Sequence, residues 1–294
     1  MADASAPVTP PIRAEFEIDE VGAAQFGEVE RPLSTFERIW NQTWIRRLVI
    51  ILVLAVAWEI YGRWLDNPLM FPPFNEVAEA FYLAFVKGPL LGRMATTLQV
   101  LFMGYGSGLV LAAIFTTLAV STRFGNDLLS TLTAMFNPLP AIALLPLALL
   151  WFGLGIPSLV FVIVHSVLWA VALNTHTGFK SVSDTLRMAG MNYGLRGVPF
   201  VMKILIPAAF PSILAGLKIG WAFAWRTLIA AELVFGVSAR SGGLGWYIFE
   251  NRNLLETANV FAGLLTVIVI GLFVEGVIFR AIEARTVRRW GMQR

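Results

Sequence analysis

The sequence predicts an all-α integral membrane protein with six transmembrane helices. Hydrophobic residues make up 57% of the 294 residues, charged residues make up only 14%, and the mean hydropathy is +0.72. A soluble globular domain carries about 25% charged residues. Six apolar runs approach or exceed the length of about 20 residues that crosses a bilayer core. Most of the chain must therefore face lipid or other helices.

Residues 1–44 form an acidic segment without an apolar run, so no signal peptide is indicated. They hold eight acidic and three basic residues, with prolines at positions 7, 10, 11 and 32. We expect residues 1–32 to be a poorly ordered cytoplasmic tail. Residues 33–44 fit a linker as well as an interfacial helix with Phe36, Ile39, Trp40 and Trp44 on one side.

The six apolar runs lie in a transmembrane domain expected over residues 45–294. They cover residues 45–65, 96–120, 128–152, 158–177, 208–237 and 260–279. Residues 68–87 are too polar to span the bilayer, and an interfacial helix after Asn75 as its N-cap fits them best. Its apolar stripe would consist of Val77, Ala80, Phe81, Ala84 and Phe85.

Small residues recur four positions apart in two of these runs, which predicts close helix packing. Gly104 and Gly108 form such a pair in the second run, and Gly216, Gly220 and Ala224 form a stripe in the fifth. The third run is interrupted instead. Asn137 precedes Pro138, and Pro140 and Pro146 follow, so backbone donors are missing within the membrane. This break either borders a translocation path or is a proline kink satisfied by neighbouring helices.

The basic residues predict the orientation. They gather before the first run, between the second and third, between the fourth and fifth, and after the sixth, whereas the other connections are balanced or uncharged. Both termini and residues 182–207 are therefore expected in the cytoplasm. That segment carries Arg187, Arg196 and Lys203 against Asp184, with glycines at 190, 194 and 197. It predicts a docking surface for a partner; a basic cytoplasmic loop without a partner is the alternative.

Charged and polar residues inside the runs are costly and need partners or a function. Arg226 and Glu232 lie deep in the fifth run, six positions apart, and so point about 120° away from each other. Arg226 would complement an anionic cargo, or it would pair with Glu232 or Glu59 of a neighbour to stabilise the fold. His165 and His176 in the fourth run lie about 16 Å apart along the helix, too far to share a metal. We predict Asn137, Pro138, His165, Arg226 and Glu232 as pathway residues; for His165 an interhelical hydrogen bond is the alternative.

From residue 58 to residue 290 the chain resembles the permease subunits of ATP-binding-cassette importers of the nitrate, sulfonate, taurine and bicarbonate group. The matching stretches are WEI at 58–60, FPPFNEV at 71–77, NPLPAIALLPLALLWFGLG at 137–155, ILIP at 204–207, AAFPSILAGLKIG at 208–220, AWRTLIAAEL at 224–233 and GGLGWYIFENRN at 242–253. Gly194 precedes Pro207 by thirteen positions, as in the family's EAA signature. The glutamate and two alanines of that signature fall on Met188, Ala189 and Gly190, so the glutamate contact is not carried over.

The resemblance implies a type I importer fold in which two permease copies form the pore above two ATPase subunits. A coupling loop over residues 178–207 would contact the ATPase, and a periplasmic or lipoprotein binding protein would deliver a small solute, an anion by the Arg226 argument. The matching coupling positions are Asp184, Arg187, Met188, Ala189, Gly190, Gly194, Arg196 and Pro207. The implied location is the bacterial inner membrane.

No cofactor is expected in this chain itself, because none of its four lysines follows a glycine in a phosphate-binding loop. ATP and Mg²⁺ would be bound by the partner ATPase, and the chain is expected not to be an enzyme. The absence of cysteine excludes disulfides and thiolate sites. Nucleic acid is not an expected partner, since the basic residues lie beside apolar runs. A stand-alone secondary transporter or channel, and a membrane anchor without transport, are the alternatives.

Overall fold

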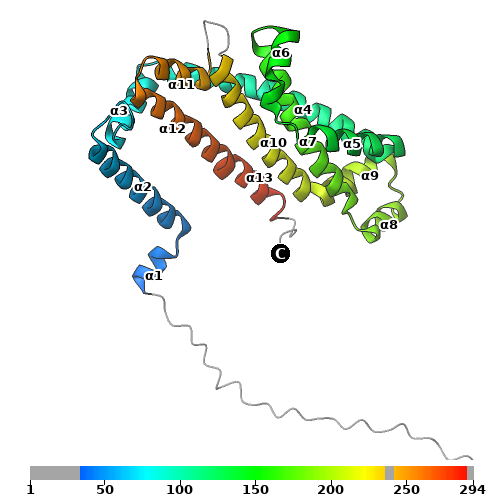
Figure 1. Ribbon diagram of the computed structural model, residues 1–294. Helices are drawn as coiled ribbons and strands as arrows, with labels where there is room; N and C mark the ends of the chain where they lie inside the picture. Colours follow the sequence, from blue (N-terminus) through cyan, green and yellow to red (C-terminus); the bar gives the residue numbers. More distant parts are fainter. Residues whose placement is uncertain (1–33, 236–241, 290–294) are drawn as a thin grey trace, which may run out of the picture. The chain divides into compact units, whose positions relative to one another are not determined.

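The computed structural model describes residues 34–235 and 242–289, and this part of the chain is helical throughout, without a strand (Figure 1). The tail expected over residues 1–32 and the end of the fifth run at Val237 lie outside the described residues. Contacts divide the chain into two units, 1–53 and 54–294. The helices are α1 (Thr35–Trp40), α2 (Thr43–Leu65), α3 (Phe74–Val86), α4 (Leu90–Ser121), α5 (Arg123–Phe136), η1 (Ala141–Leu144), α6 (Leu145–Phe152), α7 (Ile156–Lys180), α8 (Asp184–Asn192), α9 (Gly197–Phe200), η2 (Val201–Leu205), α10 (Ile206–Phe235), α11 (Leu244–Asn253), α12 (Thr257–Phe273), η3 (Val274–Phe279) and α13 (Arg280–Arg285).

Five helical segments within the described residues are long and apolar enough to cross a membrane. They are 43–65, 90–121, 156–180, 197–234 and 257–285, and they correspond to five of the six predicted runs. The last two each join several elements, with π-helical η2 and η3 inside them. Five of the six predicted spans are therefore confirmed, although the helices do not end where the apolar runs end.

The third apolar run departs from a simple span. α5 ends at the C-cap Asn137, and the chain resumes as the 3₁₀ turn η1 followed by α6. The two halves are bent by 88°, so they form either one broken span or a re-entrant pair. Pro138 and Pro140 lack the N–H groups that would continue the α5 ladder. The break therefore lies at the residues where the sequence predicted it, and it divides the run into two helices.

The first glycine pair places α4 directly against α7. A Cβ on Gly104 would lie 2.7 Å from Ile163 Cβ, and a Cβ on Gly108 would lie 2.8 Å from Val167 Cβ. Atoms essentially never approach this closely, so the two backbones meet because side chains are absent there. The predicted close packing of this run is confirmed.

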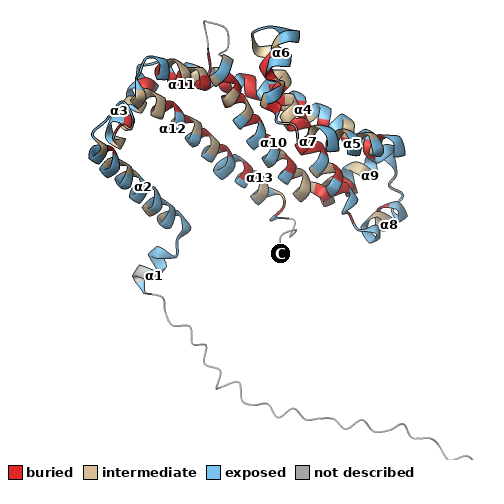
Figure 2. Cartoon of the chain, in the orientation of Figure 1, coloured by how far each residue is buried: buried red, intermediate tan, exposed pale blue. Residues whose placement is uncertain are grey.

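The second glycine stripe places α10 on α7 as well. A Cβ on Gly216 would lie 2.8 Å from Asn174 Cβ, and one on Gly220 would lie 2.8 Å from Val171 Cγ2. With α4 and α10 both packed on it, α7 is the most buried candidate span of the described residues (Figure 2). The three helices α4, α7 and α10 form the core that carries the site described below.

The α4–α7 contact supplies a first test. Replacing Gly108 with leucine should lower the free energy of unfolding by about 1–3 kcal/mol, because a side chain must displace Val167 from a closed contact. Thermal unfolding of the purified chain in one detergent measures this change. Gly106 on the same helix has no atom within 4 Å of an added Cβ, so Gly106→Leu is the matched control. Equal melting temperatures for the two variants would contradict the contact.

α3 packs against α12 and α4 through the predicted stripe. Val77 and Ala84 are buried and Ala80 and Phe81 are half-buried, whereas Phe85 is exposed. The expected N-cap Asn75 was wrong, because the N-cap is Pro73, which has no side-chain donor or acceptor.

A glutamate of α2 takes over the capping of α3. Glu59 Oε2 accepts the Asn75 backbone N–H at 3.0 Å, and Glu59 Oε1 lies 2.6 Å from Arg63 Nε. The carboxylate thus satisfies a free amide at the N-terminus of α3, where an anion is favoured.

Candidate functional site

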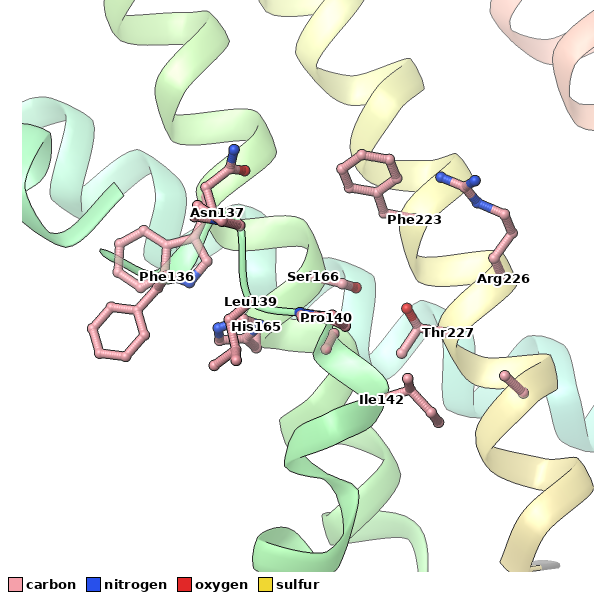
Figure 3. A pocket seen from close by; sticks show the side chains of 14 residues that line it. Phe136, Asn137, Leu139, Pro140, Ile142, His165, Ser166, Phe223, Arg226 and Thr227 are labelled. Atoms are coloured by element: carbon pink, nitrogen blue, oxygen red, sulfur yellow. The ribbon is translucent and has the colours of Figure 1, made fainter. Parts of the chain in front are cut away.

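A cavity of about 470 Å³ opens where the broken run meets α7 and α10 (Figure 3). Its walls come from the α5–η1 connection, from one face of α7 and from one face of α10. The lining residues are Phe136, Asn137, Pro138, Leu139, Pro140, Ala141, Ile142, His165, Ser166, Trp169, Phe223, Arg226, Thr227 and Ala230. Four of the five predicted pathway residues, Asn137, Pro138, His165 and Arg226, therefore come together around one cavity.

Helical periodicity explains the additional lining residues. Trp169 follows His165 by four positions, and Phe223 and Ala230 lie three positions before and four after Arg226. Residues at these spacings share a helix face. The sequence prediction had not included Ser166, Trp169, Phe223 or Thr227, although this spacing could have identified two of the four, Trp169 and Phe223.

Arg226 is the one formally charged residue among those that line the cavity. Its side chain is exposed, its Nε donates to the Ala222 carbonyl at 3.3 Å, and its guanidinium carbon lies 5.0 Å from the centre of the Phe223 ring. It forms no ion pair within residues 34–235 and 242–289. The expected alternative, a structural ion pair with Glu232 or Glu59, is not formed, so this positive charge is available in the cavity.

His165 and Trp169 present nitrogen atoms without partners at the opposite wall. Trp169 is 7% exposed, and its ring stacks on Phe136 with centroids 5.4 Å apart. His165 meets both rings edge-on at 6.2 Å. Neither ring nitrogen of His165 nor the indole nitrogen of Trp169 has a hydrogen-bond partner in the described structure. The interhelical hydrogen bond expected as the alternative for His165 is absent there.

Glu232 lies away from the cavity, in a buried cluster at the start of α11. The residue is 0% exposed, and both carboxylate oxygens lie 3.0–3.1 Å from the Thr97 hydroxyl. Its Oε2 also accepts the Gly245 N–H at 2.9 Å, while Thr97 accepts the Leu244 N–H at 2.7 Å. The two side chains thus cap α11. Of the five predicted pathway residues, Glu232 is the one that does not line the cavity.

The segment predicted as a loop over residues 182–207 contains the short helix α8 and then passes through α9 and η2 into α10. Gly194 connects α8 to α9 with φ +74°, a conformation that favours glycine. Pro207 lies inside the first turn of α10 rather than at the end of a loop. Because Pro207 has no N–H, the regular bond to Lys203 is missing, and residues 201–205 form a π-helix directly before it.

The predicted coupling residues divide into an outer and an inner group. Asp184, Met188, Gly194 and Arg196 are exposed. The inner group is Arg187, Ala189, Gly190 and Pro207, which are half-buried or buried. Only the outer group is free to contact another protein.

The inner group fixes α8 to both flanking helices. Arg187 donates from Nε to the Val182 carbonyl at 3.2 Å and from Nη2 to the Phe179 carbonyl at the end of α7. A Cβ on Gly190 would lie 2.9 Å from Ile204 Cγ1 and 3.0 Å from Phe200 Cε2, so α8 also packs closely on α9 and η2. Phe179, Val182, Leu205 and Ala209 form an apolar cluster where the end of α7 meets η2 and the start of α10.

Several helices that are apolar enough to cross a membrane surround a cavity at a broken helix. This arrangement defines a polytopic membrane protein. The family model described as binding-protein-dependent transport system inner membrane component matches residues 89–288. The chain belongs to this family, and its fold is that of type I ATP-binding-cassette permeases. It is therefore an integral inner-membrane permease subunit of an ATP-binding-cassette transport system.

Individual relatives agree with this assignment. The chain is 28% identical to a putative ABC transporter permease protein of Methanocaldococcus jannaschii, over 79% of this chain and 87% of the relative. It is 28% identical to the taurine transport system permease protein of Escherichia coli, over 77% and 82%. It is 27% identical to the nitrate import permease protein of a Synechocystis species, over 81% and 87%. These matches place it with the permeases of the nitrate, sulfonate and taurine group.

Proposed function

We propose that this chain forms the translocation path of an ATP-driven importer for a small anion and is driven through α8 by a separate ATPase. One observation carries the proposal: α7 and α10, the helices that line the cavity, are the same helices that α8 connects. The permease domain would comprise residues 45–294, after an acidic tail over 1–44.

α8 is attached to both helices that line the cavity, so a movement of α8 would be transmitted directly to the cavity. Arg187 holds the end of α7, and Gly190 packs on η2, which continues into α10. Trp169 lies eleven residues before the end of α7 at Lys180, or about 17 Å along the helix. A rigid displacement of α8 would therefore move both walls of the cavity and favour one of two states of the bundle.

The outer face of α8 and its connection fit a protein partner. Tyr193 is 87% exposed, and Met188, Met191 and Val198 are also exposed apolar residues. Exposed apolar groups beside charged ones such as Asp184 and Arg196 are typical of an interaction site. We assign this surface to the groove of an ATPase subunit, which would bind the ATP and Mg²⁺.

The assembly would contain two copies of this chain, two ATPase subunits and a substrate-binding protein on the opposite side. The concentration of lysine and arginine around α8 and in the C-terminal region supports a cytoplasmic location for both termini. Arg226 supports an anionic substrate because its charge is unpaired at the cavity. The taurine and nitrate named for two relatives are of matching chemistry, since both carry an anionic group.

The test is co-purification of the chain with its candidate ATPase, followed by uptake into proteoliposomes. Uptake that requires ATP supports the proposal, whereas uptake driven by an ion gradient without ATP supports a secondary transporter. Tyr193→Asp and Arg196→Glu should reduce the amount of co-purified ATPase at least tenfold, because a charge is buried or reversed at the contact. Tyr82, exposed on α3, gives the matched control Tyr82→Asp. Full retention of the ATPase by both α8 variants would contradict this docking surface.

A further inference from the structure

We propose that the cavity selects an amphiphilic organic anion, with an acidic group beside a planar apolar body, over a small inorganic oxyanion. This inference rests on the proposed function, since it names the substrate class of the same cavity. Two features of the lining carry it: the isolated positive charge and the aromatic wall.

The charge of the cavity favours an acid and specifies where its head group lies. Arg226 is the only formally charged residue in the lining, and no carboxylate is present there to compete for it. Figure 3 shows Phe223, Arg226 and Thr227 on the α10 side and Asn137 and His165 on the other side. A guanidinium binds carboxylates and sulfonates through two parallel hydrogen bonds. The acidic group of the ligand therefore belongs beside α10.

The remaining wall is built for an apolar body. Phe136 and Trp169 stack with an interplanar angle of 17°, and His165 stands edge-on to both. Leu139, Ile142 and Ala230 complete the apolar part of the lining. A water molecule takes about 30 Å³ in the liquid, so an ion the size of nitrate would leave most of the roughly 470 Å³ cavity to water. An aromatic acid would fill more of it and cover the rings.

The nitrogen atoms of the aromatic wall are too deeply buried for a ligand in the cavity to contact them. The Trp169 indole N–H is a donor only, and at 7% exposure it lies beyond the reach of bulk water. Neither nitrogen of His165 has a partner within the described residues. The rings of His165 and Trp169 therefore contribute apolar surface to the wall, and no hydrogen bond from them to a ligand is required.

Equilibrium dialysis of the purified full chain tests this inference with three probes: benzenesulfonate, nitrate and the neutral benzamide. Benzenesulfonate should bind at least tenfold more tightly than either of the others. Arg226→Gln should weaken benzenesulfonate binding at least tenfold, whereas Arg280→Gln, an exposed arginine of α13 away from the cavity lining, should leave it unchanged. Trp169→Leu keeps an apolar side chain but removes the aromatic face, and should weaken benzenesulfonate binding threefold or more.

Three outcomes would overturn the inference. If nitrate bound as tightly as benzenesulfonate, the apolar wall would not contribute to selection. If benzamide bound as tightly as benzenesulfonate, the charge of Arg226 would not contribute. Failure of all three probes to bind would show that the cavity is not a binding site. Each outcome leaves the proposed function intact if ATP-dependent uptake with the co-purified ATPase is observed. Conversely, benzenesulfonate binding without ATP-dependent uptake would reject the importer and retain the site.

Discussion

Glu232→Leu should reduce the free energy of unfolding by about 2–6 kcal/mol, because it leaves the Thr97 hydroxyl and the Gly245 N–H without an acceptor and each such group costs about 1–3 kcal/mol. A typical protein is stable by about 5–15 kcal/mol, so much of the variant would be unfolded or degraded. The site is also sterically closed. The carboxylate lies so close to the Gly243 backbone that a side chain on that glycine would clash with it, so a leucine at position 232 has little free space in which to turn.

The measurement is the yield and the thermal unfolding of the variant in detergent. Glu275 is an exposed glutamate in η3, so Glu275→Leu is the control and should change stability by less than about 0.5 kcal/mol. Glu232→Gln keeps one acceptor and should fall between the two. If Glu232→Leu were as stable as the control, the carboxylate would not be what holds α11.

Arg187→Ala should abolish stimulation of ATP hydrolysis by substrate while the ATPase remains bound. The substitution removes two hydrogen bonds from a guanidinium to backbone carbonyls at and beyond the end of α7, and bonds of this charged kind are worth about 1.5–3 kcal/mol each. The exposed contact residues Met188, Tyr193 and Arg196 are untouched. α8 would therefore still dock, but it would no longer move as one body with α7.

Comparing basal with substrate-stimulated ATP hydrolysis in the reconstituted complex separates coupling from folding. Arg123, an exposed arginine at the start of α5, gives the control Arg123→Ala, which should retain full stimulation. Arg187→Lys keeps the charge and one donor group, and should retain part of it. Loss of ATPase binding in Arg187→Ala would instead show that Arg187 is a contact residue.

The features that the sequence predicted correctly are those whose cause is local. Pro138 and Pro140 interrupt a helix wherever they occur in one, and Gly104 and Gly108 allow close approach whichever helix lies opposite. Helical spacing then brought His165 and Arg226 to faces that could line a cavity. The 88° bend was not predictable, because the direction of the chain after a break depends on packing rather than on the prolines.

The short helix α11 was missed for a different reason. Its N-cap Gly243 has no side chain, so the local sequence contains no capping signal. The capping groups come from Thr97 on α4 and Glu232 on α10, and only the assembled fold brings them to the first turn. The same holds for α3, where Glu59 supplies the acceptor that Asn75 was expected to provide. Glu232, which was predicted as a pathway residue, lies outside the cavity lining and caps α11.

The π-helical residues 201–205 fix the rotational phase between α8 and the cavity. An α-helix advances about 100° per residue. Deleting one residue here would therefore rotate α8 and α9 by roughly a quarter turn around the axis of α10. Tyr193 would then point in a different direction around the axis of α10, while Arg226 kept its position. Under the proposed function, the orientation of the ATPase-docking surface relative to the cavity would thus depend on the number of residues in a single helical turn.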